Sequence, residues 1–130
     1  MSDNNRLLSL VLIVSGTACC LIYPLSMVWP SGWAWHEGSP ASNDYFMMIV
    51  GVYATLGVFL IRAAKDPAAN ASFIWFTVWS SIVHAGVMAA EAVRSPMQHG
   101  HLVGDVPALI LIAIVLAVLM GRQGATAAAR

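Results

Sequence analysis

The sequence contains very few charged residues for its length. Charged side chains make up 9% of the 130 residues, compared with about 25% in an average globular protein. The six basic and six acidic residues cancel to a formal net charge of zero. A disordered chain combines high charge with low hydrophobicity, and a nucleic-acid-binding surface needs clustered positive charge. The composition therefore excludes both classes, and no nucleic-acid partner is expected.

The chain also lacks the cysteine spacing and the local motifs of several enzyme classes. Its two cysteines, Cys19 and Cys20, are adjacent within an apolar run, whereas thiol–disulfide chemistry typically uses a Cys-x-x-Cys spacing. We expect them to pack as small apolar side chains. A glycine-rich phosphate-binding loop and a nucleophile motif are also missing from the sequence.

Apolar residues, by contrast, make up 59% of the chain and gather in four runs. A helix that crosses a bilayer needs about 20 such residues, whereas a soluble bundle would need a polar stripe on each helix. We therefore predict an all-α integral membrane four-helix bundle, with the lipid bilayer as its surroundings and a single domain over residues 1–123. The helices are expected at about 7–29, 45–61, 71–93 and 105–121, and the Ala-rich tail, 124–130, is expected to be disordered.

The basic residues predict the orientation of these helices, because short cytoplasmic flanks are enriched in Lys and Arg. With both termini in the cytoplasm, only Arg94 lies on the outer side. The other basic residues, Arg6, Arg62, Lys65, Arg122 and Arg130, then all lie inside. The sequence thus predicts a multi-pass protein with cytoplasmic N- and C-termini.

Small and polar residues indicate which helix faces pack inward in a membrane. In the expected helix 71–93, a polar face centred on His84 covers about 120° at 100° per residue. Tyr23 and Cys19 share a weaker polar face of the first helix. The residues expected to line a pocket are Thr77, Ser80, Ser81, Met88, Tyr23 and Cys19.

Two further residue patterns predict local geometry. Pro24 removes a backbone donor from the outer part of the first helix and should kink it. Gly51 and Thr55, one turn apart in the second helix, should allow a neighbouring helix to approach closely.

His84 is the ionisable residue that lies deepest in a predicted span, slightly outward of the midplane. Ionisable groups at that depth are costly and often functional, although a neutral imidazole bonded to a neighbouring polar group is an equally good explanation. Glu91, two turns further on the same face, could share a polar cavity with His84 as a catalytic acid–base pair. It could equally pair with Arg94 three residues later.

The predicted outer loop between the last two helices contains a possible metal site. His99, His101 and Asp105 fall within seven residues, and the loop is expected to hang over Glu91. Imidazole and carboxylate suit a divalent transition metal. The alternatives are solvated loop histidines and an Asp105 that caps the last helix. His36 and Glu37 of the other outer loop could add ligands.

Four segments carry a resemblance to a known family. They are YPLSMVWPSGW (23–33), YATLGVFL (53–60), WSSIVHA (79–85) and GHLVGDVPAL (100–109). Together they resemble a family of small bacterial four-helix integral membrane proteins of unassigned function, over residues 23–120. The resemblance implies a bacterial membrane protein and transfers no catalytic residues.

Two functions remain open at this point. The first is a non-enzymatic protein of the bacterial inner membrane, a homo-oligomer or a subunit of a larger complex, with a polar pocket that opens to the outer side. The second is a membrane metalloprotein or an enzyme that acts on a lipid-soluble substrate through His84, Glu91 and the 97–105 loop.

Overall fold

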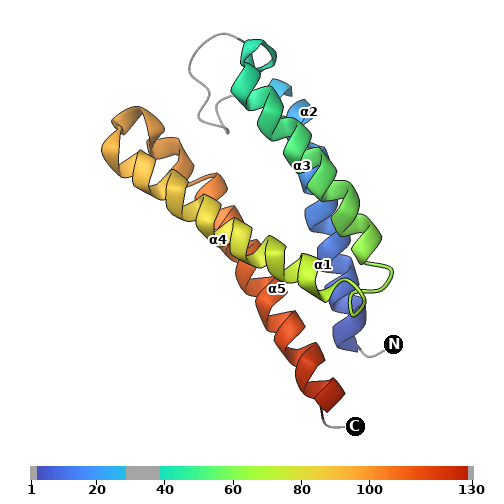
Figure 1. Cartoon of the computed structure of the whole chain (residues 1–130). Helices are drawn as coiled ribbons and strands as arrows, with labels where there is room; N and C mark the ends of the chain where they lie inside the picture. Colours follow the sequence, from blue (N-terminus) through green and yellow to red (C-terminus); the bar gives the residue numbers. More distant parts are fainter. Residues whose placement is uncertain (1–2, 29–38, 129–130) are drawn as a thin grey trace.

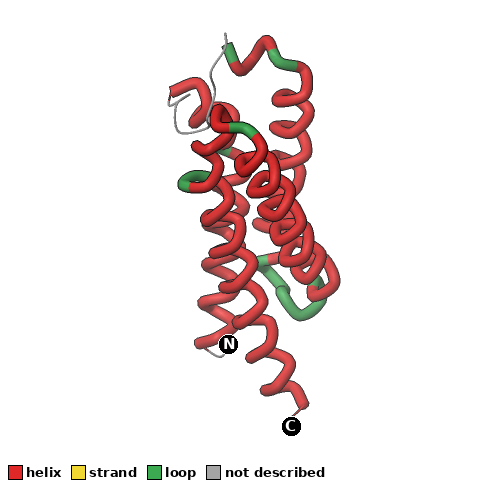
Figure 2. Tube along the Cα trace, turned by 90° about the vertical axis from the view of Figure 1, so that its left-hand side faces the viewer, coloured by secondary structure: helices red, strands yellow, loops and turns green. Residues whose placement is uncertain are grey.

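The computed structural model describes residues 3–28 and 39–128, and every regular element in these ranges is helical (Figures 1 and 2). The all-α prediction is confirmed for this part of the chain. The longer helices are α1 (Asp3–Cys20), α3 (Asp44–Ala63), α4 (Ala71–Arg94) and α5 (Asp105–Ala128). The shorter ones are α2 (Ile22–Val28) and the 3₁₀ segments η2 (Pro40–Ser42) and η3 (Pro96–Leu102).

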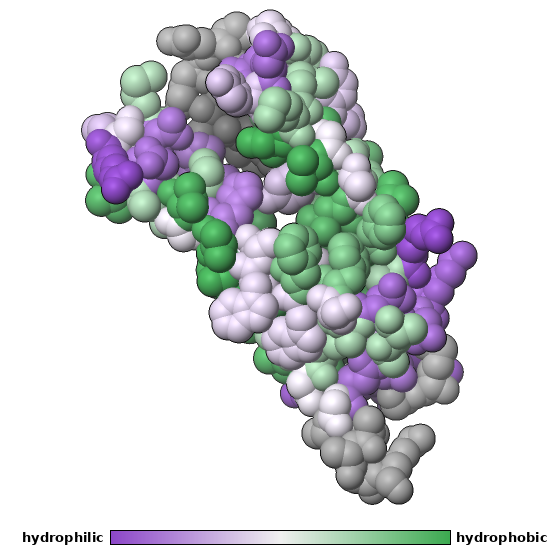
Figure 3. All heavy atoms as spheres, viewed as in Figure 1, coloured by the Kyte–Doolittle hydropathy of each residue, from purple (hydrophilic) through white to green (hydrophobic). Residues whose placement is uncertain are grey.

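Within residues 3–28 and 39–128, three helical stretches are long and apolar enough to cross a membrane, and there are four if the bent pair α1–α2 counts as one span. Bulky apolar side chains cover much of the surface; Val52, Trp79 and Leu111, for example, are each more than 60% exposed. Figure 3 shows apolar residues over the middle of the molecule and hydrophilic ones gathered towards its ends. Apolar area of this extent is rare on soluble monomers, whereas lipid covers it without cost.

The described helices form two hairpins, α1–α2 with α3 and α4 with α5, and α1 also packs against α5 (Figure 1). The start of α1, the end of α5 and the 64–70 loop lie towards one end of the molecule, here called the terminal end (Figure 1). The buried core lies in this half. It includes Leu8, Leu12, Leu60, Ile74 and Leu116. At the opposite, distal end the hairpins diverge.

Pro24 explains the break between α1 and α2. The proline ring clashes with the carbonyl four residues earlier, which belongs to Cys20, and α1 ends at that residue. The helix resumes at Ile22 with its axis turned by 55°. The predicted kink is therefore present.

Glycine allows α1 and α3 to cross closely, but at a different place from the one predicted. A β-carbon on Gly16 would lie 2.6 Å from the carbonyl oxygen of Gly57, so neither position has room for a side chain. Gly51 has no atom within 4 Å of its β-carbon position. The close approach predicted at Gly51 is thus wrong, because that face of α3 points away from α1.

The segment expected as an outer loop, 97–105, also differs from the prediction. After the single extended residue Ser95, the 3₁₀ segment η3 turns back along α4 and leads into α5 (Figure 1). Together η3 and α5 supply an apolar stretch, Pro96–Gly124, that is long enough to be a span of 29 residues. The seven residues of η3 thus carry the chain back along α4 before α5 begins at Asp105.

The last helix is longer than expected. It continues to Ala128, whereas the sequence predicted an end near 121 and a disordered tail from 124. Alanine has the highest intrinsic helix propensity, which explains why the Ala-rich segment extends the helix. The predicted end of the first helix at Trp29 and most of the 30–43 loop lie outside the described residues.

Candidate functional site

A tyrosine and a histidine meet between the two hairpins. The Tyr53 hydroxyl lies 2.8 Å from Nδ1 of His84, and the two rings are arranged edge to face with centroids 5.8 Å apart. Tyr53 is near the middle of α3, and His84 is just distal of the middle of α4. Both residues are half-buried. The pair therefore lies deep in the apolar part of both helices, where an uncompensated polar group is costly.

A second polar pair lies where η3 meets α5. Nδ1 of His101 is 3.0 Å from both carboxylate oxygens of Asp105, and the side chains are only 16% and 26% exposed. Asp105 also accepts a hydrogen bond from the backbone N–H of Val106, so the carboxylate helps to begin α5. Asp105, at the start of α5, therefore provides the carboxylate that orients His101.

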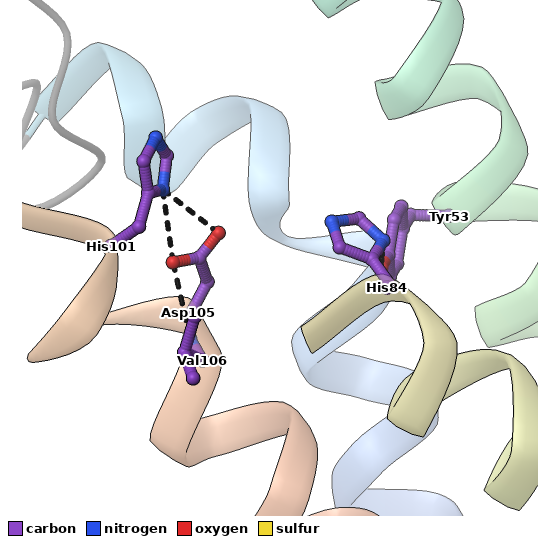
Figure 4. A network of polar contacts seen from close by, with 5 residues as sticks. All are labelled: Tyr53, His84, His101, Asp105 and Val106. Carbon is purple, nitrogen blue, oxygen red and sulfur yellow. Dashed lines mark hydrogen bonds and ion pairs between the residues drawn. The ribbon is translucent and has the colours of Figure 1, made fainter. Parts of the chain in front are cut away.

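Both pairs lie in the distal half, one between α3 and α4 and the other where η3 meets α5. Figure 4 shows Tyr53 and His84 on one side, His101 and Asp105 on the other, with the α1–α2 bend behind them. We call Tyr53, His84, His101 and Asp105 the distal polar group.

A shallow, open hollow of about 330 Å³ adjoins His84 on the surface of α4, and its lining is mainly apolar. It is lined by Ser80, Val83, His84, Val87 and Met88. The Ser80 hydroxyl is turned to the helix backbone, since it donates to the Thr77 carbonyl. Among the described residues, the imidazole of His84 has no hydrogen-bond partner besides Tyr53. Its Nε2 points away from Tyr53 (Figure 4), so this nitrogen is available to a ligand.

The model of a sequence family described as "Family of unknown function (DUF6632)" matches residues 2–130. The chain belongs to this family. No curated protein and no solved structure matches the chain. Membership in the DUF6632 family assigns no function to the chain.

In this member of the DUF6632 family, the polar face predicted on 71–93 divides into two stripes. Thr77 and Ser81 are buried in the helix packing, and the Thr77 hydroxyl donates to the Phe73 carbonyl. Ser80 and Met88 instead line the hollow with His84. Of the two residues predicted on the first helix, Tyr23 is 36% exposed and Cys19 is half-buried.

Glu91 does not join the distal polar group. Its carboxylate forms a 3.0 Å ion pair with Arg94, and both side chains are at least half exposed. Such surface pairs contribute little to stability. Of the two arrangements that the sequence left open for Glu91, the structure therefore shows the ion pair.

The four proposed metal ligands are not brought together. His101 and Asp105 are in contact, whereas His99 is exposed and Glu91 pairs with Arg94. Across residues 3–28 and 39–128, no three His, Cys, Asp or Glu side chains form a group suited to a metal ion. His36 and Glu37 lie outside the described residues.

Tyr53 is the member of the distal polar group that sequence reasoning missed. A tyrosine at the centre of an apolar run is unusual, since membrane tyrosines are enriched at the interfaces. The position of Tyr53 in the sequence could therefore have identified it as a residue of interest. Its partner could not be named, however, because the pairing depends on how α3 and α4 face each other.

Proposed function

We propose that this chain is a non-enzymatic membrane protein that binds the polar group of a lipid-soluble molecule in its distal half. The observation that carries the proposal is the available Nε2 of His84 beside the hollow on α4. A polar atom at this depth is costly without a partner. Small-molecule sites combine a mostly apolar lining with a few placed polar groups, and the open hollow on α4 has such a lining.

Binding is favoured over acid–base catalysis by the arrangement of the ionisable groups. The catalytic pair suggested by the sequence was His84 with Glu91, and Glu91 pairs with Arg94 at the surface instead. Tyr53 occupies Nδ1 of His84, which fixes the ring in one orientation. Fixed donors and acceptors around an open hollow suit recognition of a bound group.

The proposal includes the location and the orientation of the chain. We place it in a bacterial cytoplasmic membrane, with the terminal end in the cytoplasm, because Arg6, Arg62, Lys65 and Arg122 are at that end. The hollow and the distal polar group then belong to the outer half of the bilayer.

A homo-oligomer or a larger complex is the expected assembly. In each of the three long apolar stretches, only 17–28% of the most apolar 18-residue segment is buried within the chain. Most of the surface of each span is therefore left for lipid or for neighbouring proteins. Small bundles of this kind gain stability from such partners.

The test fills the hollow and asks whether a co-purifying molecule is lost. Val87→Trp places a large ring in the hollow, and Val93→Trp is the matched control because Val93 is on the same helix, is 78% exposed and does not line the hollow. Organic extracts of both variants and of the wild type, purified in mild detergent, are compared by mass spectrometry. We expect a lipid-soluble molecule in the wild type and the control and its loss from Val87→Trp. Equal retention by all three proteins would overturn the proposal.

A further inference from the structure

Resting on the proposed function, we infer that the ligand is an uncharged lipid with a carbonyl oxygen, which accepts a hydrogen bond from Nε2–H of His84. The inference follows from the tautomer of His84, from the lining of the hollow and from the position of the nearby charges.

The tautomer follows from counting donors. If the Tyr53 hydroxyl donates to Nδ1 of His84, a single donor, Nε2–H, lacks a partner among the described residues. If Nδ1–H donates to Tyr53 instead, both the phenol proton and the lone pair of Nε2 lack partners. Unpaired polar groups are costly in an apolar environment, so the first arrangement is favoured. His84 therefore presents a donor, and the complementary ligand group is an acceptor.

The hollow indicates that the rest of the ligand is apolar. Val83, Val87 and Met88 contribute hydrocarbon and thioether surface, and the Ser80 hydroxyl is directed to the Thr77 carbonyl. The flexible Met88 side chain adapts to irregular shapes. An aliphatic chain or ring therefore fits beside the single donor.

The ionised groups of the distal half indicate that the acceptor is neutral. Asp105 is paired with His101, and Glu91 is paired with Arg94 at the surface. No basic side chain among the described residues is thus placed to neutralise an anionic ligand at the depth of His84. A carboxylate or phosphate there would remain uncompensated, at a large cost. A ketone, quinone or ester carbonyl avoids that cost.

Two lipid sources share this chemistry, isoprenoid quinones and the ester carbonyls of glycerolipids. The test titrates the full chain in dodecylmaltoside with decylubiquinone, with dioctanoylglycerol and with dodecane, which has no acceptor. The dissociation constant is obtained from the rise of the unfolding midpoint with ligand concentration. A lower Kd for one carbonyl probe identifies the source, and either result supports the shared chemistry.

His84→Phe keeps a ring but removes the donor. We expect it to raise the Kd of the carbonyl probes about tenfold, the effect of losing one hydrogen bond, and to leave dodecane unchanged. Tyr53→Phe keeps His84 but removes the hydroxyl that fixes its tautomer. We expect the Kd of the carbonyl probes to rise about threefold. If carbonyl probes bind both variants as well as they bind the wild type, while Val87→Trp abolishes binding, the inference is wrong and the proposed function stands. If Val87→Trp binds every probe normally, the proposed function itself fails.

Nitrogen NMR of the wild-type chain gives a test that does not depend on how the variants fold. We expect the ¹⁵N shifts of His84 to show a protonated Nε2 and an unprotonated Nδ1, with the Nε2 proton moving downfield when a carbonyl probe binds. The opposite tautomer, or a proton that does not respond to any carbonyl probe, would overturn the inference.

Discussion

The backbones of Gly16 and Gly57 lie so close together that neither residue has room for a β-carbon. A β-carbon on Gly16 would be 2.6 Å from the Gly57 carbonyl oxygen and 2.8 Å from the Ile61 side chain. Backbone carbonyls cannot yield as a flexible side chain does. The two glycines therefore set the distance between α1 and α3, and with it the position of Tyr53 four residues earlier on α3.

Gly57→Ala should force α1 and α3 apart. We expect a loss of about 1–3 kcal/mol of unfolding free energy, as for other overpacked sites, measured by titration with SDS in mixed micelles. Gly86→Ala is the control, since nothing lies within 4 Å of its β-carbon position, and a change within about 0.5 kcal/mol is expected there. Equal effects at the two positions would contradict the close crossing.

Tyr53 and His84 should stabilise the fold as a pair. Tyr53→Phe removes the hydroxyl at 2.8 Å from Nδ1, and we expect a loss of about 1 kcal/mol. A double-mutant cycle with His84→Phe should give a coupling energy of similar size. Tyr45→Phe serves as the control because Tyr45 is 77% exposed. Additive effects of Tyr53→Phe and His84→Phe would show that the pair does not form in the membrane-embedded protein.

Asp105 has two separable roles, one towards His101 and one towards the start of α5. Asp105→Asn keeps an oxygen for the Val106 N–H but loses the charge-assisted bond to His101, with an expected cost of about 1–2 kcal/mol. Asp105→Ala loses both and should cost about 1 kcal/mol more, the usual value of one hydrogen bond. The comparison uses the same SDS titration, and the order of the two variants is the result that matters. A more stable Ala variant would show that the carboxylate does not hold η3 against α5.

The orientation can be tested with reporter fusions in bacterial cells. We expect green fluorescent protein fused after residue 130 to fluoresce and alkaline phosphatase at that position to be inactive. Alkaline phosphatase inserted after Gln98, at the distal end, should be active. The reverse pattern would place the distal polar group on the cytoplasmic side, in conflict with the distribution of Lys and Arg.

Much of the fold could be predicted from local features of the sequence. The expected helices 45–61 and 71–93 match α3 and α4 to within a few residues, because their apolar runs are bounded by polar residues. The break near Pro24 was predictable since proline acts on its own helix. The errors concern η3 and the C-terminal end of α5. The histidine-containing segment reads as a loop by composition, although it runs back along α4 as part of a span.

The candidate site was predictable only in part. The depth of His84 identified it as a residue of interest, because position along a helix follows from sequence alone. The expected partner Glu91 shares the helix face of His84, but the structure pairs His84 with Tyr53 from another helix. The metal ligands were grouped by their closeness in sequence. In space, only His101 and Asp105 among them come into contact.

The sequence by itself determined that this protein is helical, that its helices are apolar enough for a membrane and where its few polar residues fall along them. These properties depend on spacing along single segments. Only the tertiary structure decided that Gly57 rather than Gly51 meets α1, that Tyr53 reaches His84 and that η3 runs back along α4 before α5 begins at Asp105. The reason is physical: these contacts depend on the crossing of helices and on the path of η3, and neither is encoded in the periodicity of any one segment.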